Sequence, residues 1–206
     1  MEKVVITIAR QYGSGGKTVG RMLAQDLGIP CYEREILKMA SEDSGINEKL
    51  FAQVDEKLKA GFFSKLVGNV YSGDLISPES ENFVSNDNLF NYQAKVLKEL
   101  AERESFVVIG RCADFILKDR PNVISVFVHA PKDFCLEMAA ERHGRTPHEM
   151  EKFVQKVDKY RADYYKYYTG HDWLNAKNYD LCLDSSKLGF DKCVDAIKGY
   201  MEVRMK

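Results

Sequence analysis

Residues 4–18 read VVITIARQYGSGGKT, and this stretch decides the fold. Its first six residues form a short apolar run rich in β-branched side chains, which is typical of a strand buried on both faces. The glycine cluster at residues 13–16 ends that strand, and apolar residues at helical spacing follow as far as Leu27. A strand, a glycine-rich turn and a helix in this order form an arrangement that binds phosphate through backbone N–H groups and a helix N-terminus.

The turn matches the end of the phosphate-loop pattern G-x-x-x-x-G-K-[ST], but Gln11 stands where the pattern has its first glycine. We predict that phosphate is bound here by Gly13, Ser14, Gly15, Gly16, Lys17 and Thr18. In this interpretation Lys17 neutralises the oxygens of the transferred phosphoryl group, and the hydroxyl of Thr18 binds Mg²⁺. The alternative is an ordinary glycine-rich turn with a solvated lysine.

Strand-like and helix-like patterns alternate along the rest of the chain. Further apolar runs at residues 106–109, 123–129 and 179–183 end at turn residues, and helical patterns occupy residues 132–142 and 190–203. Alternation of this kind predicts an α/β fold with a parallel sheet wrapped by helices. We expect the first strand in the centre of the sheet, between the second and third, and the fourth at or near an edge.

Composition and charge limit the class of protein. The 206 residues are 45% hydrophobic and 30% charged, which excludes a disordered tail, a collagen and a small disulfide scaffold. Thirty basic residues against 31 acidic ones give a net charge of −1, so no overall field attracts nucleic acid or a membrane surface. The five cysteines are scattered and form no C-x-x-C pair, and no apolar run reaches the ~18 residues that cross a bilayer. We expect a cytoplasmic protein with reduced thiols and neither nucleic-acid nor membrane partners.

Several short motifs occur in a fixed order along the chain. They are LGIP at residues 27–30 with YE at 32–33, VIGR at 108–111, VFV at 126–128 with AP at 130–131, RADYY at 161–165, and YDLCLDS at 179–185. Together with the phosphate loop, this set resembles the cytidylate kinase-like branch of the P-loop nucleoside monophosphate kinases. The resemblance implies a P-loop fold with five parallel strands and helices on both faces.

The same resemblance implies a division of labour along the chain. It predicts one kinase domain over residues 1–206, with a helical monophosphate-binding insertion at about 33–104 and a helical lid at about 141–175. It further implies ATP and Mg²⁺ as cofactors and a nucleoside monophosphate, CMP or dCMP, as the acceptor.

The phosphate loop departs from the family pattern by one position. Compared without gaps, cytidylate kinases carry GPSGSGKGT where residues 10–18 read RQYGSGGKT. The leading glycine is therefore Arg10, the lysine position holds Gly16, and Lys17 comes one residue later, about 100° further around a helix. Either the loop shifts to bring Lys17 back, or Arg10 and arginines of the lid supply the missing charge.

The predicted lid begins with ERHGRTP at residues 141–147. We predict that Arg142 and Arg145, with Arg161 on the following helix, are catalytic and stabilise the charge on the transferred phosphoryl group when the lid excludes water. The alternative for each is an ordinary surface arginine. The tyrosines between residues 160 and 168 are interpreted as helix packing in preference to stacking on nucleic acid.

The acceptor side is predicted from the end of the second apolar run. Arg111 stands where an open parallel sheet binds ligands, and its planar guanidinium suits a monophosphate or the edge of a pyrimidine. Cytidylate kinases place an acid directly after this Gly-Arg pair, but here Cys112 takes that place and Asp114 follows. We predict that Arg111 and Asp114 bind the acceptor; the alternative is that Arg111 starts a helix and pairs with Asp114.

These patterns together predict a kinase that moves the γ-phosphoryl group of ATP to CMP, dCMP or a related small nucleotide. Two alternatives follow from the departures. The displaced Lys17 and the glutamine at position 11 fit a non-catalytic nucleotide-binding module of the same fold. Cys112, where the family has an acid, fits a kinase for a different small acceptor.

Overall fold

The computed structural model describes residues 3–57, 71–141 and 146–205, with the side chains of residues 53–57 excluded. Five strands form one parallel sheet in the order β2-β3-β1-β4-β5. The strands are β1 (Val5–Arg10), β2 (Cys31–Tyr32), β3 (Phe106–Ile109), β4 (Val123–His129) and β5 (Leu181–Asp184). Because all strands are parallel, their carboxyl ends lie at one edge of the sheet, where such folds bind ligands.

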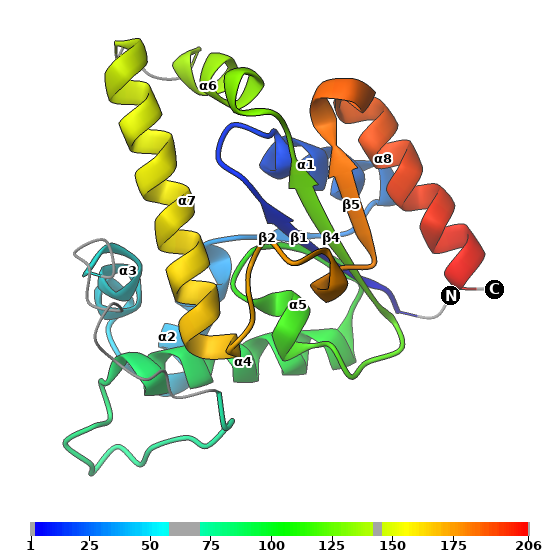
Figure 1. The fold of residues 1–206 in the computed structure, drawn as a ribbon. Coiled ribbons are helices and arrows are strands. Elements are labelled where there is room, and N and C mark those ends of the chain that lie inside the picture. The colour runs from blue at the N-terminus through cyan, green and yellow to red at the C-terminus, as the bar shows by residue number, and fades with distance from the viewer. Residues whose placement is uncertain (1–2, 58–70, 142–145, 206) are drawn as a thin grey trace.

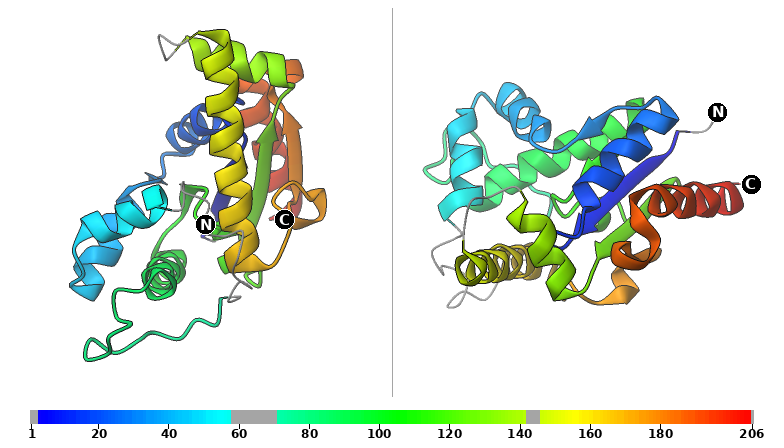
Figure 2. Two further views of the ribbon diagram at one scale, coloured as in Figure 1. Left: turned by 60° about the vertical axis from the view of Figure 1, so that its left-hand side comes forward. Right: turned by 90° about the horizontal axis from the view of Figure 1, so that it is seen from above.

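Helices cover both faces of the sheet (Figure 1). The helices are α1 (Gly16–Leu27), α2 (Glu35–Ser44), α3 (Glu48–Lys57), α4 (Asn86–Arg103), α5 (Ala113–Ile116), α6 (Lys132–Ala140), α7 (Pro147–Thr169) and α8 (Ser185–Arg204), with a 3₁₀ turn at Ala176–Asn178. Helices α1 and α8 pack on one face, and α4, α5 and α7 pack on the other (Figure 2).

The alternation of side chains along β1 explains these two layers. Ile6 and Ile8 point to the face covered by α1 and α8, whereas Val5 and Ala9 point to the opposite face. All four are buried. A strand between two helical layers must be apolar on both sides, which is why the run in β1 is continuous instead of alternating.

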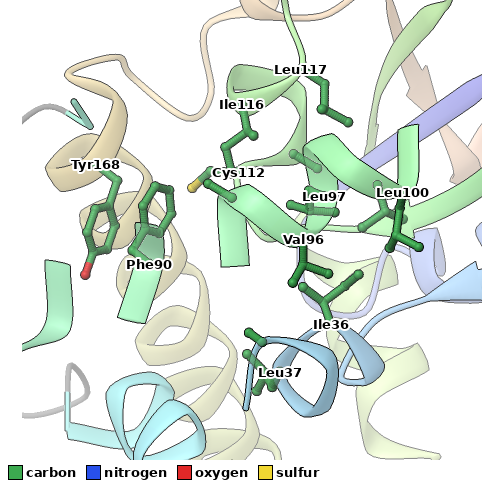
Figure 3. Packing of buried hydrophobic residues seen from close by; sticks show 14 of the residues in the cluster. Ile36, Leu37, Phe90, Val96, Leu97, Leu100, Cys112, Ile116, Leu117 and Tyr168 are labelled. Atoms are coloured by element: carbon green, nitrogen blue, oxygen red, sulfur yellow. The ribbon is translucent and has the colours of Figure 1, made fainter. Parts of the chain in front are cut away.

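The larger of the two cores lies on the face covered by α4. Leu97 and Leu100 of α4 pack there with Ile36 of α2 (Figure 3). Nearer the start of α4, the ring of Phe90 stacks on Tyr168 of α7 with ring centroids 3.9 Å apart. The stretch predicted as an insertion at residues 33–104 therefore also supplies α4, a helix of the main core.

The sheet confirms the expected strand order. Strand β1 is central, β3 and β4 flank it, and β5 lies at an edge. The periodicity of the sequence did not indicate β2, because it has only two residues. The last helix begins at Ser185, earlier than expected, because Asp184 caps it by accepting the Ser186 N–H at 3.1 Å. It is interrupted at Gly189, whose dihedrals are not helical.

Helix α6 ends at Ala140, and the end of the predicted helix, Arg142, lies outside the described residues. The predicted lid stretch contains α7, a helix of 23 residues that begins with a capping box between Thr146 and Glu149. Within the described residues, no helix has the length and apolar character required to span a membrane.

Candidate functional site

The phosphate loop connects Arg10, the last residue of β1, to Gly16, the first residue of α1. Hydrogen bonds from two serine hydroxyl groups hold this loop in place. The buried Ser14 donates to the carbonyl oxygens of Gln11 and Val128, each at 3.0 Å. Ser185, at the start of α8, donates to the Ser14 carbonyl at 2.7 Å. These bonds tie the loop to β4 and α8.

Two glycines in the loop are required by its geometry. Gly13 and Gly15 both have positive φ, at 82° and 76°. A Cβ atom on Gly13 would overlap the backbone carbonyl of Cys135 in α6, and one on Gly15 would overlap the ring of Phe190 in α8. The loop therefore passes closely between two helices in a conformation that only glycine adopts at low cost.

The backbone N–H groups of residues 13–18 have no hydrogen-bond acceptor among the described residues. The first helical bond of α1 is donated by Val19 to Gly15 at 2.9 Å. Unpaired N–H groups at a helix N-terminus attract an anion, because they carry partial positive charge. This loop therefore fits the phosphates of a nucleotide.

Thr18 lies in the first turn of α1, and its hydroxyl makes no hydrogen bond to a described residue. The described part of the chain contains no group of three His, Cys, Asp or Glu side chains that could hold a metal ion alone. A Mg²⁺ ion here would therefore share phosphate oxygens with the Thr18 hydroxyl, which is how this hard cation is commonly bound with nucleotides.

A cavity of about 380 Å³ lies beside the loop. Its described lining includes four arginines but a single carboxylate, and most of the remaining side chains are aromatic. The residues are Arg10, Tyr12, Glu33, Arg34, Ile109, Arg111, Phe153, Val157, Tyr160, Arg161 and Tyr164. Such a lining suits a ligand with negative charge and a planar or apolar part.

Arg10 lies at the centre of this positive charge. Its guanidinium packs against Gly110, and a Cβ atom at position 110 would overlap the guanidinium. Burial, followed by the positive charge of Arg161, lowers the pKa of Arg10 to about 9. The guanidinium therefore lacks full compensation within the protein, and an anionic ligand would supply it.

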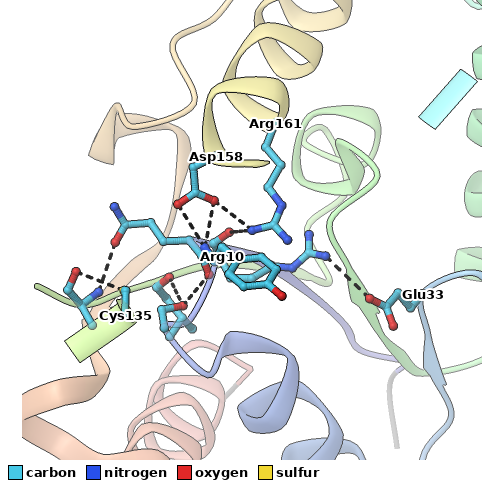
Figure 4. Close-up of polar contacts among 10 residues, drawn as sticks. Arg10, Glu33, Cys135, Asp158 and Arg161 are labelled. Carbon is cyan, nitrogen blue, oxygen red and sulfur yellow. Dashed lines mark hydrogen bonds and ion pairs between the residues drawn. The ribbon is translucent and has the colours of Figure 1, made fainter. Parts of the chain in front are cut away.

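Glu33 connects the cavity to the phosphate loop. Figure 4 shows its ion pair with Arg10. Its Oε2 atom lies 2.5 Å from Lys17 Nζ, and its Oε1 atom lies 3.7 Å from Arg10 Nη2. Its backbone carbonyl accepts a hydrogen bond from Arg111 Nε at 3.2 Å. Burial alone would raise the pKa of Glu33, but the hydrogen bond from Lys17 and the charges of Lys17 and Arg10 outweigh it and lower the pKa. The carboxylate is thus the shared counterion of both cations.

Helix α7 contributes a second ion pair to the same region (Figure 4). Arg161 Nη1 donates to Asp158 Oδ1 at 3.0 Å and to the carbonyl oxygen of Arg10 at 3.1 Å. Asp158 also accepts the backbone N–H of Tyr12, with its two oxygens 2.9 and 3.1 Å from that nitrogen. The guanidinium of Arg161 is therefore fixed at the wall of the cavity.

The structure brings most of the predicted site residues together. Arg10, Arg111 and Arg161 line one cavity, and Lys17 reaches it through Glu33. Arg142 and Arg145 lie outside the described residues, so their predicted role stays a prediction.

Asp114 is placed differently from the sequence-based expectation. Its carboxylate is buried beneath α7 and accepts a hydrogen bond from the Tyr165 hydroxyl at 2.6 Å. It is not among the residues that line the cavity. Burial raises the pKa of Asp114 to about 6. The carboxylate therefore has a hydrogen-bond partner within the protein, and its predicted contact with an acceptor stays a prediction.

Sequence reasoning did not assign Glu33, Arg34 or Asp158 to the site. Glu33 and Arg34 follow β2 directly at the carboxyl edge of the sheet, so a recognised strand would have indicated them. Asp158 stands three residues before Arg161, a spacing that places both on one helix face. Its contact with Tyr12 has no local signal in the sequence.

The chain is similar to known proteins over most of its length. The model of the cytidylate kinase-like family matches residues 5–187. A cytidylate kinase from Methanopyrus kandleri is 24% identical over 208 residues, covering 97% of this chain and 93% of that protein.

Two solved structures extend the comparison. An uncharacterized protein from Eubacterium ventriosum is 28% identical, with a TM-score of 0.71 and coverage of 97% of this chain and 99% of that one. A shikimate kinase from Bacteroides thetaiotaomicron has a TM-score of 0.55 at 14% identity, with coverage of 97% and 98%. The second likeness concerns the fold alone.

Proposed function

Because the chain belongs to the cytidylate kinase-like family, we propose that it transfers the γ-phosphoryl group of ATP to a nucleoside monophosphate, with CMP or dCMP as the preferred acceptor. The observation that carries this proposal is the junction of two anion-binding features. The unpaired N–H groups of the phosphate loop adjoin a cavity with four arginines, and Glu33 contacts cations of both. Two phosphorylated ligands would meet at this junction.

The charges divide between the two ligands in a simple way. The loop N–H groups and Lys17 would hold the β- and γ-phosphates, and Arg34 and Arg111 would bind the phosphate of the acceptor. Arg10 and Arg161 lie between them and would stabilise the negative charge on the phosphoryl group during transfer. Aromatic side chains of α7 leave room for a nucleobase beside them.

In the transfer, an oxygen of the acceptor phosphate attacks the γ-phosphorus, the bond from that phosphorus to the bridging oxygen breaks, and ADP leaves. Mg²⁺, when bound at Thr18, would neutralise charge on the β- and γ-oxygens. A phosphate oxygen is already ionised, so positioning and charge suffice and the protein needs no strong base.

The test is an ADP-release assay with MgATP and each of the common nucleoside monophosphates. We expect turnover with CMP or dCMP. The Arg111→Ala variant should raise the KM for the acceptor and leave ATP affinity unchanged, whereas the surface control Arg103→Ala should change neither. Binding of MgATP without turnover on any acceptor would instead support the non-catalytic nucleotide-binding module.

Glu33 favours a second candidate, a kinase for a small anionic alcohol. Its carboxylate lies beside Lys17, the residue expected at the transferred phosphoryl group, and could accept the proton of an attacking hydroxyl. An acceptor phosphate would not use such a base. The same assay with an anionic hydroxyl acceptor such as shikimate separates the candidates, because Glu33→Gln should abolish turnover of an alcohol but not of a monophosphate.

A further inference from the structure

Tyr12 joins the phosphate loop to α7 through three separate contacts. Its backbone N–H is bound by both carboxylate oxygens of Asp158. Its ring meets the ring of Phe153 edge to face, with centroids 5.2 Å apart. The guanidinium of Arg161 lies over the same ring, 5.6 Å from its centroid. One loop residue is thus held by three residues of one helix.

The face of α7 that holds Tyr12 also lines the cavity. Phe153, Tyr160, Arg161 and Tyr164 all contribute to the cavity wall. Any ligand that moves or orders this face of α7 therefore acts on Tyr12 as well. Asp158 is the charged link, because it bonds simultaneously to the loop backbone and to a cavity arginine.

We propose that Asp158 is a positioning residue that couples the acceptor cavity to the phosphate loop. It fixes the Tyr12 N–H on one side and the Arg161 guanidinium on the other. This inference rests on the proposed function for the identity of the two ligands. If the two sites are coupled, the coupling is reciprocal: acceptor binding strengthens binding of the triphosphate, and the triphosphate strengthens binding of the acceptor by the same factor.

The carboxylate of Asp158 offsets the positive charge of Arg161, which lies close to the positive charge of Arg10. Arg161 and Arg10 are close enough for the charge of Arg161 to lower the pKa of Arg10. Asp158 is the ion-pair partner of Arg161, and both side chains are about one-fifth exposed, at 21%. Without Asp158, Arg161 would keep its contacts with the Arg10 carbonyl and the Tyr12 ring but would lose its ion-pair partner, and the Arg10 guanidinium would repel it.

Two substitutions separate the two bonds of Asp158. Asp158→Asn keeps an oxygen for the Tyr12 N–H but loses the charge that holds Arg161, whereas Asp158→Ala loses both. Asp163→Asn is the matched control, because Asp163 lies on the same helix but forms an exposed ion pair with Lys159. Inorganic triphosphate is the binding probe, since its binding can be measured by calorimetry without any acceptor.

We expect Asp158→Ala to weaken triphosphate binding at least about tenfold, in line with the loss of a hydrogen bond to a charged group. By NMR, the Tyr12 amide should exchange with solvent faster than in the wild type. Asp158→Asn should bind triphosphate within about threefold of the wild type but lower the kcat for the acceptor at least about tenfold. Asp163→Asn should match the wild type in every measurement.

Wild-type triphosphate affinity and an unchanged Tyr12 amide exchange rate in Asp158→Ala would overturn the proposal. If that variant fails to fold, Asp158→Asn decides the matter: an unchanged kcat at an unchanged melting temperature would overturn it, and a lowered kcat would support it. A wild-type protein that turns over no acceptor would refute the proposed function, while triphosphate binding and amide exchange would still test the role of Asp158.

Discussion

At Gly13, a positive φ coincides with a contact that leaves no room for a side chain. The residue packs against the backbone carbonyl of Cys135, which belongs to a helix and cannot move aside easily. Gly28 has a similar φ, 64°, at the end of α1, but nothing lies within 4 Å of a Cβ atom built there. An alanine at Gly28 would therefore suffer only backbone strain, whereas an alanine at Gly13 would suffer backbone strain and a steric overlap.

We predict that Gly28→Ala costs about 1 kcal/mol of stability, the strain of a left-handed L-residue. Gly13→Ala should cost clearly more and also weaken inorganic triphosphate binding, because the loop must move to relieve the overlap. Urea unfolding measures the first effect, and calorimetry the second. Equal stability and equal triphosphate affinity in the two variants would show that the loop has space at Gly13.

Asp114 supplies a prediction about pH. Its folded-state pKa of about 6 lies above the ordinary value of a carboxyl group, because the side chain is buried. The folded state therefore holds this proton more tightly than the unfolded state. The resulting stabilisation is fully present below the unfolded pKa and is lost as the pH rises through 6.

Asp114→Asn removes this titration and keeps an oxygen for the Tyr165 hydroxyl. Its unfolding free energy relative to the wild type should therefore rise by about 1 kcal/mol between pH 5 and pH 7.5. Urea unfolding of both proteins at the two pH values measures this. If the unfolding free energies of the variant and the wild type differ by the same amount at both pH values, the pKa of Asp114 is not raised.

Among the elements, the strands were predictable from the sequence wherever burial made them continuously apolar. Residues 106–109 and 123–129 match β3 and β4, and β1 lies within one residue of its predicted range. Strand β2 was not predicted because it has only two residues, which pair with β3 at one edge of the sheet. Too few residues carry the pattern there for a periodicity to be visible.

The phosphate loop was equally predictable, because its glycines and lysine are adjacent in the sequence. Contacts across the chain were not. The bond from Tyr12 to Asp158 joins residues 146 positions apart.

Asp114 was assigned to the acceptor because it follows Arg111 closely. Gly110, Arg111 and Cys112 all have positive φ, so the chain turns sharply between the two side chains. Arg111 reaches the cavity, and Asp114 packs beneath α7.

In the proposed transfer, the loop and α7 together supply the positive charge that acts on the phosphoryl group. Lys17→Ala should weaken ATP binding and lower turnover, because the lysine adjoins the loop N–H groups. Arg161→Ala should lower turnover about 10²-fold and leave ATP affinity nearly intact, since its charge acts on the transition state. Steady-state kinetics with calorimetry distinguish these effects. We expect the same result for Arg142→Ala on sequence grounds.

If Lys17 shares its role with the arginines, loss of either Arg161 or Arg142 must lower turnover. If Arg161→Ala and Arg142→Ala both keep wild-type turnover while Lys17→Ala abolishes it, Lys17 alone serves the phosphates. The one-residue displacement of this lysine would then be absorbed by the loop.

At the scale of the whole molecule, the parallel sheet gathers residues that are distant in the sequence. Arg10 ends β1, Glu33 follows β2 and Arg111 follows β3, so all three lie at one edge. Helix α7 crosses the same edge and adds Arg161. We propose that this edge binds ATP at the loop and an anionic acceptor in the adjoining cavity.

Calorimetric titration of the full chain with ATP, with and without Mg²⁺, tests that claim most directly. We expect magnesium-dependent binding at submillimolar ATP that weakens at least about tenfold in Lys17→Ala. No magnesium-dependent ATP binding at millimolar nucleotide would contradict it.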